Sequence, residues 1–397
     1  MISSVDTADL LTEEASSTKD KTYISAFFIT APVFIGYACC FSLQHRLGNV
    51  FGLADGAAGN SRSYYYGIGT SFVYFFNLIF RVIGHNLLFG CFSPRVRVII
   101  ALASMIVGQT MLSVVAMAKS PPHLAWVFIS YAFCGVCEGS YCPNMFNVVN
   151  NLGKTRQQVV TAIPFGVSLI TILGFALFSF GMPFQLCYMF TSVCTFGAII
   201  LYLIKIYPVA NTSASTFSFK DFFNDFKNIK EWFPKIWGHC LVFIINMFCL
   251  SLFNPGCTLY AFNERVHYKL LGFTLPHDAF ILTCNIGNFL GDLLSRIVMD
   301  RKRIINPMFF FILLIFGIIT NLALIPEITP LASFVFGWAN GGLYTQTTKL
   351  IGLLFVDKYH LTAMSTWLFV GDVGSTSGSN CVQPMRPVLV GIKQIEY

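Results

Sequence analysis

The chain has 397 residues and a formal net charge of +7, and 55% of its residues are hydrophobic while only 11% are charged. Because about a quarter of the residues in a typical soluble domain are charged, this composition excludes an ordinary soluble domain and predicts an integral membrane protein. A chain of this length has room for roughly ten to twelve transmembrane helices of about 20 residues each.

Residues 1–22 carry five acids and no apolar core. They are therefore predicted to form a cytosolic amino-terminal tail and not a cleavable signal peptide. Apolar runs long enough to cross about 30 Å of hydrocarbon then predict transmembrane helices 1–6 within residues 23–206. These six runs cover residues 23–43, 67–90, 97–118, 124–149, 158–181 and 183–206.

Residues 207–235 are polar and predict a cytosolic central loop. Five further apolar runs predict transmembrane helices 7–11 within residues 236–380. These runs cover residues 236–261, 276–299, 304–325, 329–353 and 361–379. Residues 381–397 are too mixed to complete a helix and predict a short, divergent carboxyl-terminal tail. The predicted fold class is an all-α integral membrane protein with about 11 transmembrane helices in a 6+5 arrangement.

Lysine and arginine are unevenly distributed between the predicted connections. With the amino terminus in the cytosol, the inner segments hold fifteen of the 25 basic residues and the outer segments hold seven. Because cytosolic loops are enriched in these residues, the pattern predicts a cytosolic amino terminus and an external carboxyl terminus. The net charge of +7 then reflects this bias and contact with anionic lipid headgroups, so no nucleic acid partner is predicted.

The sequence contains no recognisable catalytic constellation. Cys134 and Cys137 form a CxxC pair, but they lie one helical turn apart inside an apolar run, where cysteine behaves as a small hydrophobic residue. There is no phosphate-binding glycine loop, no HExxH and no GxSxG. We therefore predict no catalytic residue, no metal, no cofactor and no enzyme activity.

Asp292 and Arg296 lie in the middle of the eighth apolar run. They are four residues apart, so they share one helix face and can pair. Each charge near the bilayer centre costs about 2.5–3.5 kcal/mol, so both are expected to face the protein interior or a water-filled cavity. Asn288 and Asn285 lie on or near the same face. Two interpretations remain open: a structural ion pair that locks helices together, or a polar site that contacts a solute.

Polar residues also interrupt the first half of the chain. Asn77, Arg81 and His85 are spaced four apart at the end of the second run, where they line either a lumen or a loop. Glu138 lies in the fourth run. Such an acid is protonated, faces a cavity, pairs with Arg81 or Arg296, or is solvated near the membrane surface.

Two glycine pairs, 135/139 and 337/341, are spaced four residues apart in the fourth and tenth runs. Small residues at this spacing allow two helix backbones to approach closely. We predict that both pairs serve helix packing.

Asp292-x-x-x-Arg296 in the eighth run resembles the signature of the equilibrative nucleoside transporter family. Four further stretches resemble family motifs: "SLFNPGC" (251–257), "GWANGGL" (337–343), "FCGVCEGSYCPNMFNVVNN" (133–151) and "PFGVSL" (164–169). The resemblance implies a major-facilitator-like 6+5 fold and a role for Asp292 and Arg296 in substrate binding. It also implies a helix break or gate at Pro255 and Gly256, and a binding role for Asn340.

Two positions depart from the family pattern. The Trp-Asn pair that is common in the first span aligns with Leu43 and Gln44. The solute-reading glutamine of the fourth span aligns with Glu138 or Cys142, depending on the register. We retain all four residues as candidate substrate-binding positions, beside Asp292, Arg296, Asn288 and Asn340.

The resemblance implies a carrier that moves nucleosides or nucleobases by alternating-access facilitated diffusion, with or without proton coupling. Two alternatives remain open: a transport-inactive membrane scaffold or sensor that keeps the fold, and a carrier for another small polar solute. The expected partners are the solute and the lipid bilayer. We expect a monomeric multi-pass protein in the plasma membrane.

Overall fold

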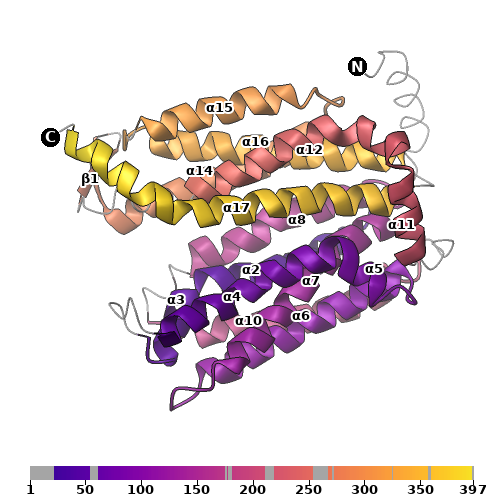
Figure 1. The fold of residues 1–397 in the computed structure, drawn as a ribbon, viewed down its shortest axis with the longest axis horizontal. Helices are drawn as coiled ribbons and strands as arrows, with labels where there is room; N and C mark the ends of the chain where they lie inside the picture. The colour runs from indigo at the N-terminus through magenta and orange to yellow at the C-terminus, as the bar shows by residue number, and fades with distance from the viewer. Residues whose placement is uncertain are drawn as a thin grey trace. The chain divides into compact units, whose positions relative to one another are not determined.

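The computed structural model describes residues 22–53, 61–174, 177, 181–210, 219–253, 267–270, 272–323, 325–355 and 359–395. The described residues are nearly all helical (Figure 1). The chain divides into two compact units. Unit 1 comprises Met1–Glu231 and Phe355–Thr366, and unit 2 comprises Trp232–Leu354 and Trp367–Tyr397.

Unit 1 is built from long helices, two of which continue into π-helices. In chain order its elements are α2 (Ser25–Ser42), α3 (Gln44–Val50), α4 (Ser61–Ile79), η1 (Phe80–Gly84), α5 (His85–Leu87), α6 (Pro94–Ala116), α7 (Ala125–Val149), α8 (Thr155–Ser168), η2 (Leu169–Gly174), α10 (Gln185–Lys205) and α11 (Phe219–Lys227). α7 packs against α4, η1 and α6, while α2 packs against α8 and α10.

Unit 2 contains α12 (Ile229–Leu252), β1 (His267–Leu270), β2 (Phe273–Pro276), α14 (His277–Asp300), α15 (Met308–Leu322), α16 (Thr329–Leu354) and most of α17 (His360–Ile395). α16 packs against both α14 and α15, and α14 and α16 lie side by side in Figure 1. Glycines 371, 374 and 378 of α17 lie against α12.

Six helices of the described part of the chain are long and apolar enough to cross a membrane: Ser25–Ser42, Tyr65–Leu87, Pro94–Ala116, Thr155–Gly174, Gln185–Lys205 and Ile229–Leu252. Large apolar side chains are exposed along α10 and α15, at a spacing that places them on one helix face. The chain is therefore a multi-pass membrane protein. The other predicted spans are helical at α7, α14, α15, α16 and α17, but eleven crossings remain a prediction.

The described residues are nearly all helical, as predicted, and they depart from the prediction where β1 and β2 form a short antiparallel hairpin. Gly272 has a φ of 85° in the turn between the strands, a backbone conformation that glycine adopts without a Cβ clash. Within the predicted central loop at 207–235, the structure places α11 and the start of α12. Phe222 and Phe226 are four residues apart and their rings contact each other, which stabilises α11.

The predicted tail at 381–397 is also revised, because α17 continues to Ile395. The tail was predicted because its composition is too mixed to give a clear helix pattern. Just before it, α17 is rich in glycine and serine, which lower helix propensity, but the glycines let α17 approach α12: a methyl group at residue 374 or 378 would meet a backbone carbonyl of the neighbouring helix. Tertiary packing therefore outweighs propensity here.

Both glycine pairs lie at close helix contacts, as predicted. A methyl group added at either glycine of the α7 pair (Gly135 and Gly139) would meet the backbone of α4 or η1. A methyl group at either glycine of the α16 pair (Gly337 and Gly341) would meet the backbone of α14. The helices therefore pack backbone to backbone at these points.

Candidate functional site

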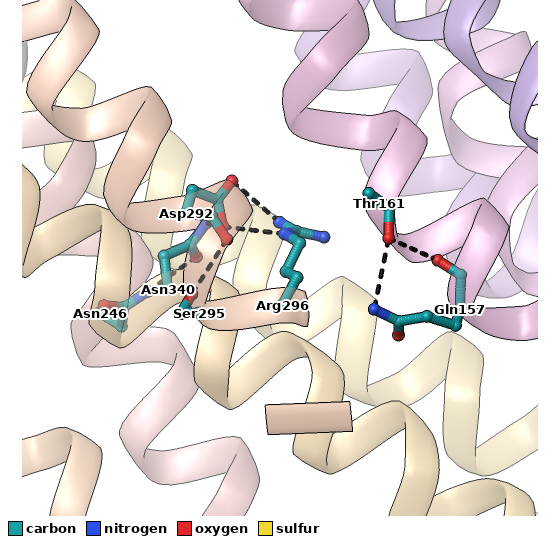
Figure 2. A network of polar contacts seen from close by, with 7 residues as sticks. All are labelled: Gln157, Thr161, Asn246, Asp292, Ser295, Arg296 and Asn340. Atoms are coloured by element: carbon teal, nitrogen blue, oxygen red, sulfur yellow. Dashed lines mark hydrogen bonds and ion pairs between the residues drawn. The ribbon is translucent and has the colours of Figure 1, made fainter. Parts of the chain in front are cut away.

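Asp292 and Arg296 of α14 form a two-point ion pair inside unit 2 (Figure 2). Arg296 donates from Nε to Asp292 Oδ1 at 2.8 Å and from Nη2 to Oδ2 at 3.1 Å. Both residues are buried. The predicted pairing is confirmed, and the two parallel hydrogen bonds fix the carboxylate and guanidinium planes relative to each other.

A chain of amides reaches Asp292 from two other helices. Asn246 of α12 donates from Nδ2 to Asn340 Oδ1 at 2.9 Å, and Asn340 of α16 donates to Asp292 Oδ1 at 3.4 Å (Figure 2). The chain orients the Asn340 amide so that its donor faces the carboxylate. Three helices of unit 2 thus converge on one buried acid.

Tyr344 of α16 completes the surroundings of Arg296. The guanidinium carbon lies 4.5 Å from the centre of the Tyr344 ring, which is the geometry of a cation–π contact. The same ring packs against Trp367, whose indole stacks on Phe243 at 4.4 Å. The cation is therefore held by an acid on one side and by an aromatic cluster on another.

The glycines of both helices explain why Asn340 can reach Asp292. Each turn of the α14–α16 contact has a glycine on one helix facing a backbone carbonyl of the other: Gly287 faces Pro330, Gly291 faces Phe334, and the α16 pair faces Asn288 and Asp292. Larger residues would separate the backbones and lengthen the contact between the amide and the acid.

The two members of the pair differ in exposure. The Asp292 side chain is 11% exposed and the Arg296 side chain is 1% exposed. Asp292 Oδ2 accepts one hydrogen bond from the described residues, and a carboxylate oxygen has two lone-pair directions. The arrangement can therefore accept a further hydrogen bond at the acid, while Arg296 orients the carboxylate.

The other candidate positions of unit 2 have different surroundings. Asn288 lies one turn before Asp292 and is half-buried, and its Oδ1 accepts no hydrogen bond from the described residues. Pro255 and Gly256 lie outside the described residues, so their predicted helix break stays a prediction.

Leu43 and Gln44 lie at a helix junction in unit 1, between the end of α2 and the start of α3. Leu43 is fully buried, so it is part of the apolar core. Gln44 is half-buried and donates from Nε2 to Thr70 Oγ1 of α4 at 2.6 Å. Its backbone carbonyl accepts a hydrogen bond from the Tyr66 hydroxyl at 2.7 Å. This amide bridges two helices of unit 1.

Glu138 and Cys142 are one turn apart on α7 and both are buried. Asn77, Arg81 and His85, on the helix that faces α7, are also buried, so the interpretation of this stripe as a loop end is wrong. Likewise, Glu138 is not an acid solvated near a membrane surface. Unit 1 thus contains a second group of buried polar residues.

Sequence reasoning missed Asn246 and Tyr344. Tyr344 follows Asn340 by one helical turn, a spacing that was visible, but the chain has 16 tyrosines and nothing marks this one. The buried polar run at 345–349 was missed as well. Within it, Gln346 donates to the Met299 carbonyl at 2.7 Å and accepts from the Ile305 amide at 3.0 Å, which satisfies the backbone at the end of α14.

The described residues contain no group of three or more His, Cys, Asp and Glu side chains that could hold a metal ion. Cys134 and Cys137 are free thiols, and Cys134 Sγ accepts a hydrogen bond from Gln109 Nε2 at 3.5 Å.

No protein-family model matches the sequence, and no curated protein matches it. Solved structures do match over most of the chain. The human organic anion transporter MFSD10 (TETRAN) is 13% identical, with a TM-score of 0.65 over 91% of this chain and 92% of that one. The major facilitator superfamily transporter FucP, in its outward conformation, is 16% identical, with a TM-score of 0.60 over 90% of each chain.

The peptide transporter POT, in complex with alafosfalin, is 13% identical, with a TM-score of 0.59 over 96% of this chain and 94% of that one. Identities this low establish the fold alone, and this chain has a fold like that of these major-facilitator-type transporters. The expectation of a major-facilitator-like fold is confirmed, while the 6+5 helix count stays a prediction. The closer resemblance to equilibrative nucleoside transporters stays a prediction.

Proposed function

We propose that the protein is a membrane carrier, not an enzyme, and that it moves nucleosides or nucleobases by alternating-access facilitated diffusion. The observation that carries the proposal is the buried Asp292–Arg296 pair in the second half of α14, with Asn340 directed at its acid. Charged residues within the membrane are costly, and they are concentrated on substrate and ion pathways. The major-facilitator fold is a scaffold on which such a pathway is commonly built.

The exposures of the pair suggest how it would contact a solute. A ribose hydroxyl or a base N–H would donate to the Asp292 carboxylate, because the acid is the more accessible member. Arg296 would act mainly by orienting the acid. Asn340 and the half-buried Asn288 would add amide groups that both donate and accept, as a nucleobase edge requires.

The proposal includes several points that follow from the sequence pattern. The carrier would be a monomer with eleven spans, a cytosolic amino terminus and a cytosolic central segment at residues 207–235, and it would reside in the plasma membrane. A tag inserted in that segment tests the orientation, because antibody should reach it only after cells are permeabilised. Labelling of intact cells would reverse the proposed topology.

The decisive experiment is uptake of labelled adenosine, inosine, hypoxanthine and uridine into proteoliposomes or cells that express the chain, at several external pH values. Saturable uptake of at least one compound is expected. Uptake that does not change with the pH gradient would exclude proton coupling. If a well-expressed protein took up none of them, a transport-inactive scaffold or a carrier for another solute would be favoured instead.

A charge exchange separates the solute-contact role of the pair from a structural role. Substitution Asp292→Asn leaves Arg296 as a buried cation, so its loss of transport is ambiguous. The double substitution Asp292→Arg with Arg296→Asp keeps both charges at the same spacing. We expect surface expression to return and transport to stay low, because acceptor and donor have exchanged places. Full transport by the exchanged protein would mean that the pair is structural.

A further inference from the structure

The two units contain the same short pattern on equivalent helices. α7 carries "GVCEG" at 135–139 and α16 carries "GWANG" at 337–341, so each glycine pair encloses one polar residue just before its second glycine. That residue is Glu138 in unit 1 and Asn340 in unit 2. The helix packing also repeats, since α7 contacts α4 and α6, and α16 contacts α14 and α15.

The register of the facing helices repeats as well. In unit 1, the first glycine of the α7 pair faces the amide nitrogen of Asn77 and the second faces its carbonyl oxygen. In unit 2, the first glycine of the α16 pair faces the amide nitrogen of Asp292 and the second faces its carbonyl oxygen. Asn77 therefore occupies the position of Asp292, and Arg81, four residues later, occupies the position of Arg296.

The two units have an arginine at the same position of the repeat, but their acids lie on different helices. In unit 2 the acid precedes the arginine by one turn on the same helix, and the amide lies across the helix contact. In unit 1 the amide, Asn77, precedes Arg81, and the acid, Glu138, lies across the contact. Glu138 is the only buried acid among the described residues of unit 1. A methyl group at Gly139, the residue after Glu138, would lie 3.0 Å from the backbone nitrogen of Arg81, so Glu138 and Arg81 lie at the same helix contact.

The backbone at Arg81 differs from that at Arg296. Arg81 lies within the π-helix η1, whereas α14 is α-helical from His277 to Asp300. π-helical turns are rare, and they occur frequently at functional sites. A wider turn also changes the direction of the side chains that follow it. The chain therefore combines a buried cation, an acid on the neighbouring helix and an irregular turn at one place.

We propose that Asn77, Arg81 and Glu138 form a second solute-contact site, located within unit 1 and resting on the proposed carrier function. Arg81 donates hydrogen bonds to acceptors of the solute, such as a carbonyl or ring nitrogen of a nucleobase, and Glu138 supplies the counter-charge. The Asp292 site offers acceptors and takes hydroxyl donors, so the two sites prefer chemically different groups of a solute.

Arg81→Lys tests the site with the smallest structural change. A lysine keeps the positive charge but loses the planar, five-donor fork. We expect near-normal surface expression and an increase in KM of about tenfold or more for inosine, the scale of one charge-assisted hydrogen bond. Arg97→Lys is the matched control. Arg97 is also buried in unit 1, and its guanidinium donates to Asn86 Oδ1 at 2.9 Å and to backbone carbonyls, so its substitution should leave the KM of the expressed protein unchanged.

A second variant gives unit 1 the residue pattern of unit 2. Asn77→Asp combined with Glu138→Asn restores an acid one turn before Arg81, and so compensates its charge within one helix. A purely structural charge pair predicts normal expression and a normal KM. A solute-contact site predicts normal expression with a raised KM, because the guanidinium N–H groups of Arg81 then donate to the acid on its own helix instead of to the solute.

The ratio of kcat/KM between two nucleosides does not depend on how much of a variant is folded, so it separates a change in recognition from misfolding. Adenosine differs from inosine at the base edge, and 2′-deoxyinosine differs from it at the ribose. Arg81 variants should change the adenosine-to-inosine ratio of kcat/KM, whereas Asp292 variants should change the deoxyinosine-to-inosine ratio. For any variant that fails to reach the membrane, stabilisation of the purified protein by inosine, measured as a shift in melting temperature, replaces uptake.

Wild-type uptake is measured first, so the two proposals can fail separately. No uptake of any nucleoside by the wild type counts against the carrier function itself. Normal wild-type uptake with an unchanged KM and unchanged selectivity in Arg81→Lys and in the double variant would overturn the second site alone.

Discussion

The α4/η1–α7 contact of unit 1 and the α14–α16 contact of unit 2 differ in where an acid lies relative to a buried arginine. Each buries an arginine at the same register of a glycine-lined helix pair. In unit 2 the arginine is neutralised by an acid of its own helix, so the ion pair needs no neighbouring helix. In unit 1 the nearest acid in the repeat lies on the other helix. An acid of this repeat can therefore compensate Arg81 only across the helix contact.

The two contacts also differ in tightness. A methyl group at Gly139 would lie 2.6 Å from the Asn77 carbonyl oxygen, and a methyl group at Gly341 would lie closer still to that of Asp292. The helix facing Gly139 continues into a π-turn, while the helix facing Gly341 is regular. Unit 2 thus combines a local ion pair with the closer helix contact, and unit 1 combines a longer contact with an arginine whose nearest acid in the repeat lies on the neighbouring helix.

The largest effect is expected when the local ion pair loses its acid. Asp292→Asn leaves a nearly inaccessible guanidinium uncompensated, which costs about 3–5 kcal/mol in a buried pair. The detergent-purified variant should therefore melt well below the wild type. Replacing both charges, as Asp292→Asn with Arg296→Gln, should recover much of the loss because no buried charge remains. A single variant that melts like the wild type would mean that Arg296 finds another acid.

Glycine substitutions probe the difference in tightness. Gly341→Ala forces α14 and α16 apart, and overpacking of this kind costs about 1–3 kcal/mol. Gly139→Ala should cost less, because its contacts are longer and η1 can adjust. Gly197→Ala on α10 is the control: nothing lies within 4 Å of its added methyl group, and alanine favours the helix. Melting temperatures should fall in the order Gly197→Ala, Gly139→Ala, Gly341→Ala. An equal loss at both packed glycines would remove the distinction between the units.

The sequence predicted the parts of the molecule that depend on local spacing. Asp292 and Arg296 were recognised as a pair because four residues make one helical turn, and the glycine pairs were recognised for the same reason. What it did not predict depends on the register between helices. The correspondence of Asn77 with Asp292 becomes visible only when α4 is set against α7. The π-turn at Arg81 has no residue pattern of its own, and the hairpin at 267–276 was hidden between two apolar runs.

The aromatic partner of Arg296 is expected to contribute less than its acid. Tyr344→Leu removes the ring that lies 4.5 Å from the guanidinium carbon, and a desolvated cation–π contact contributes about 2 kcal/mol. Tyr344→Phe keeps a ring face and should lose less. Comparison of the two melting temperatures isolates the ring from the hydroxyl. Equal losses in both variants would assign the effect to the hydroxyl group and not to the cation–π contact.

The smallest effect is expected at the outer end of the amide chain. Asn246→Ala removes the donor that orients Asn340, and a single intramolecular hydrogen bond contributes about 0.5–1.5 kcal/mol. Asn340 is then free to turn its amide, so the loss in stability should be accompanied by a change in the affinity of the Asp292 site for its solute.

Asn380→Ala is the matched control, because this exposed asparagine donates to the Thr376 carbonyl of its own helix. If the amide chain orients the Asp292 site, Asn246→Ala should raise the KM for the transported solute while Asn380→Ala leaves it unchanged. If it serves only packing, Asn246→Ala should lower the melting temperature and leave KM as it is. Measuring both quantities on both variants therefore shows whether the local ion pair of unit 2 is as independent of its neighbours as the comparison with unit 1 implies.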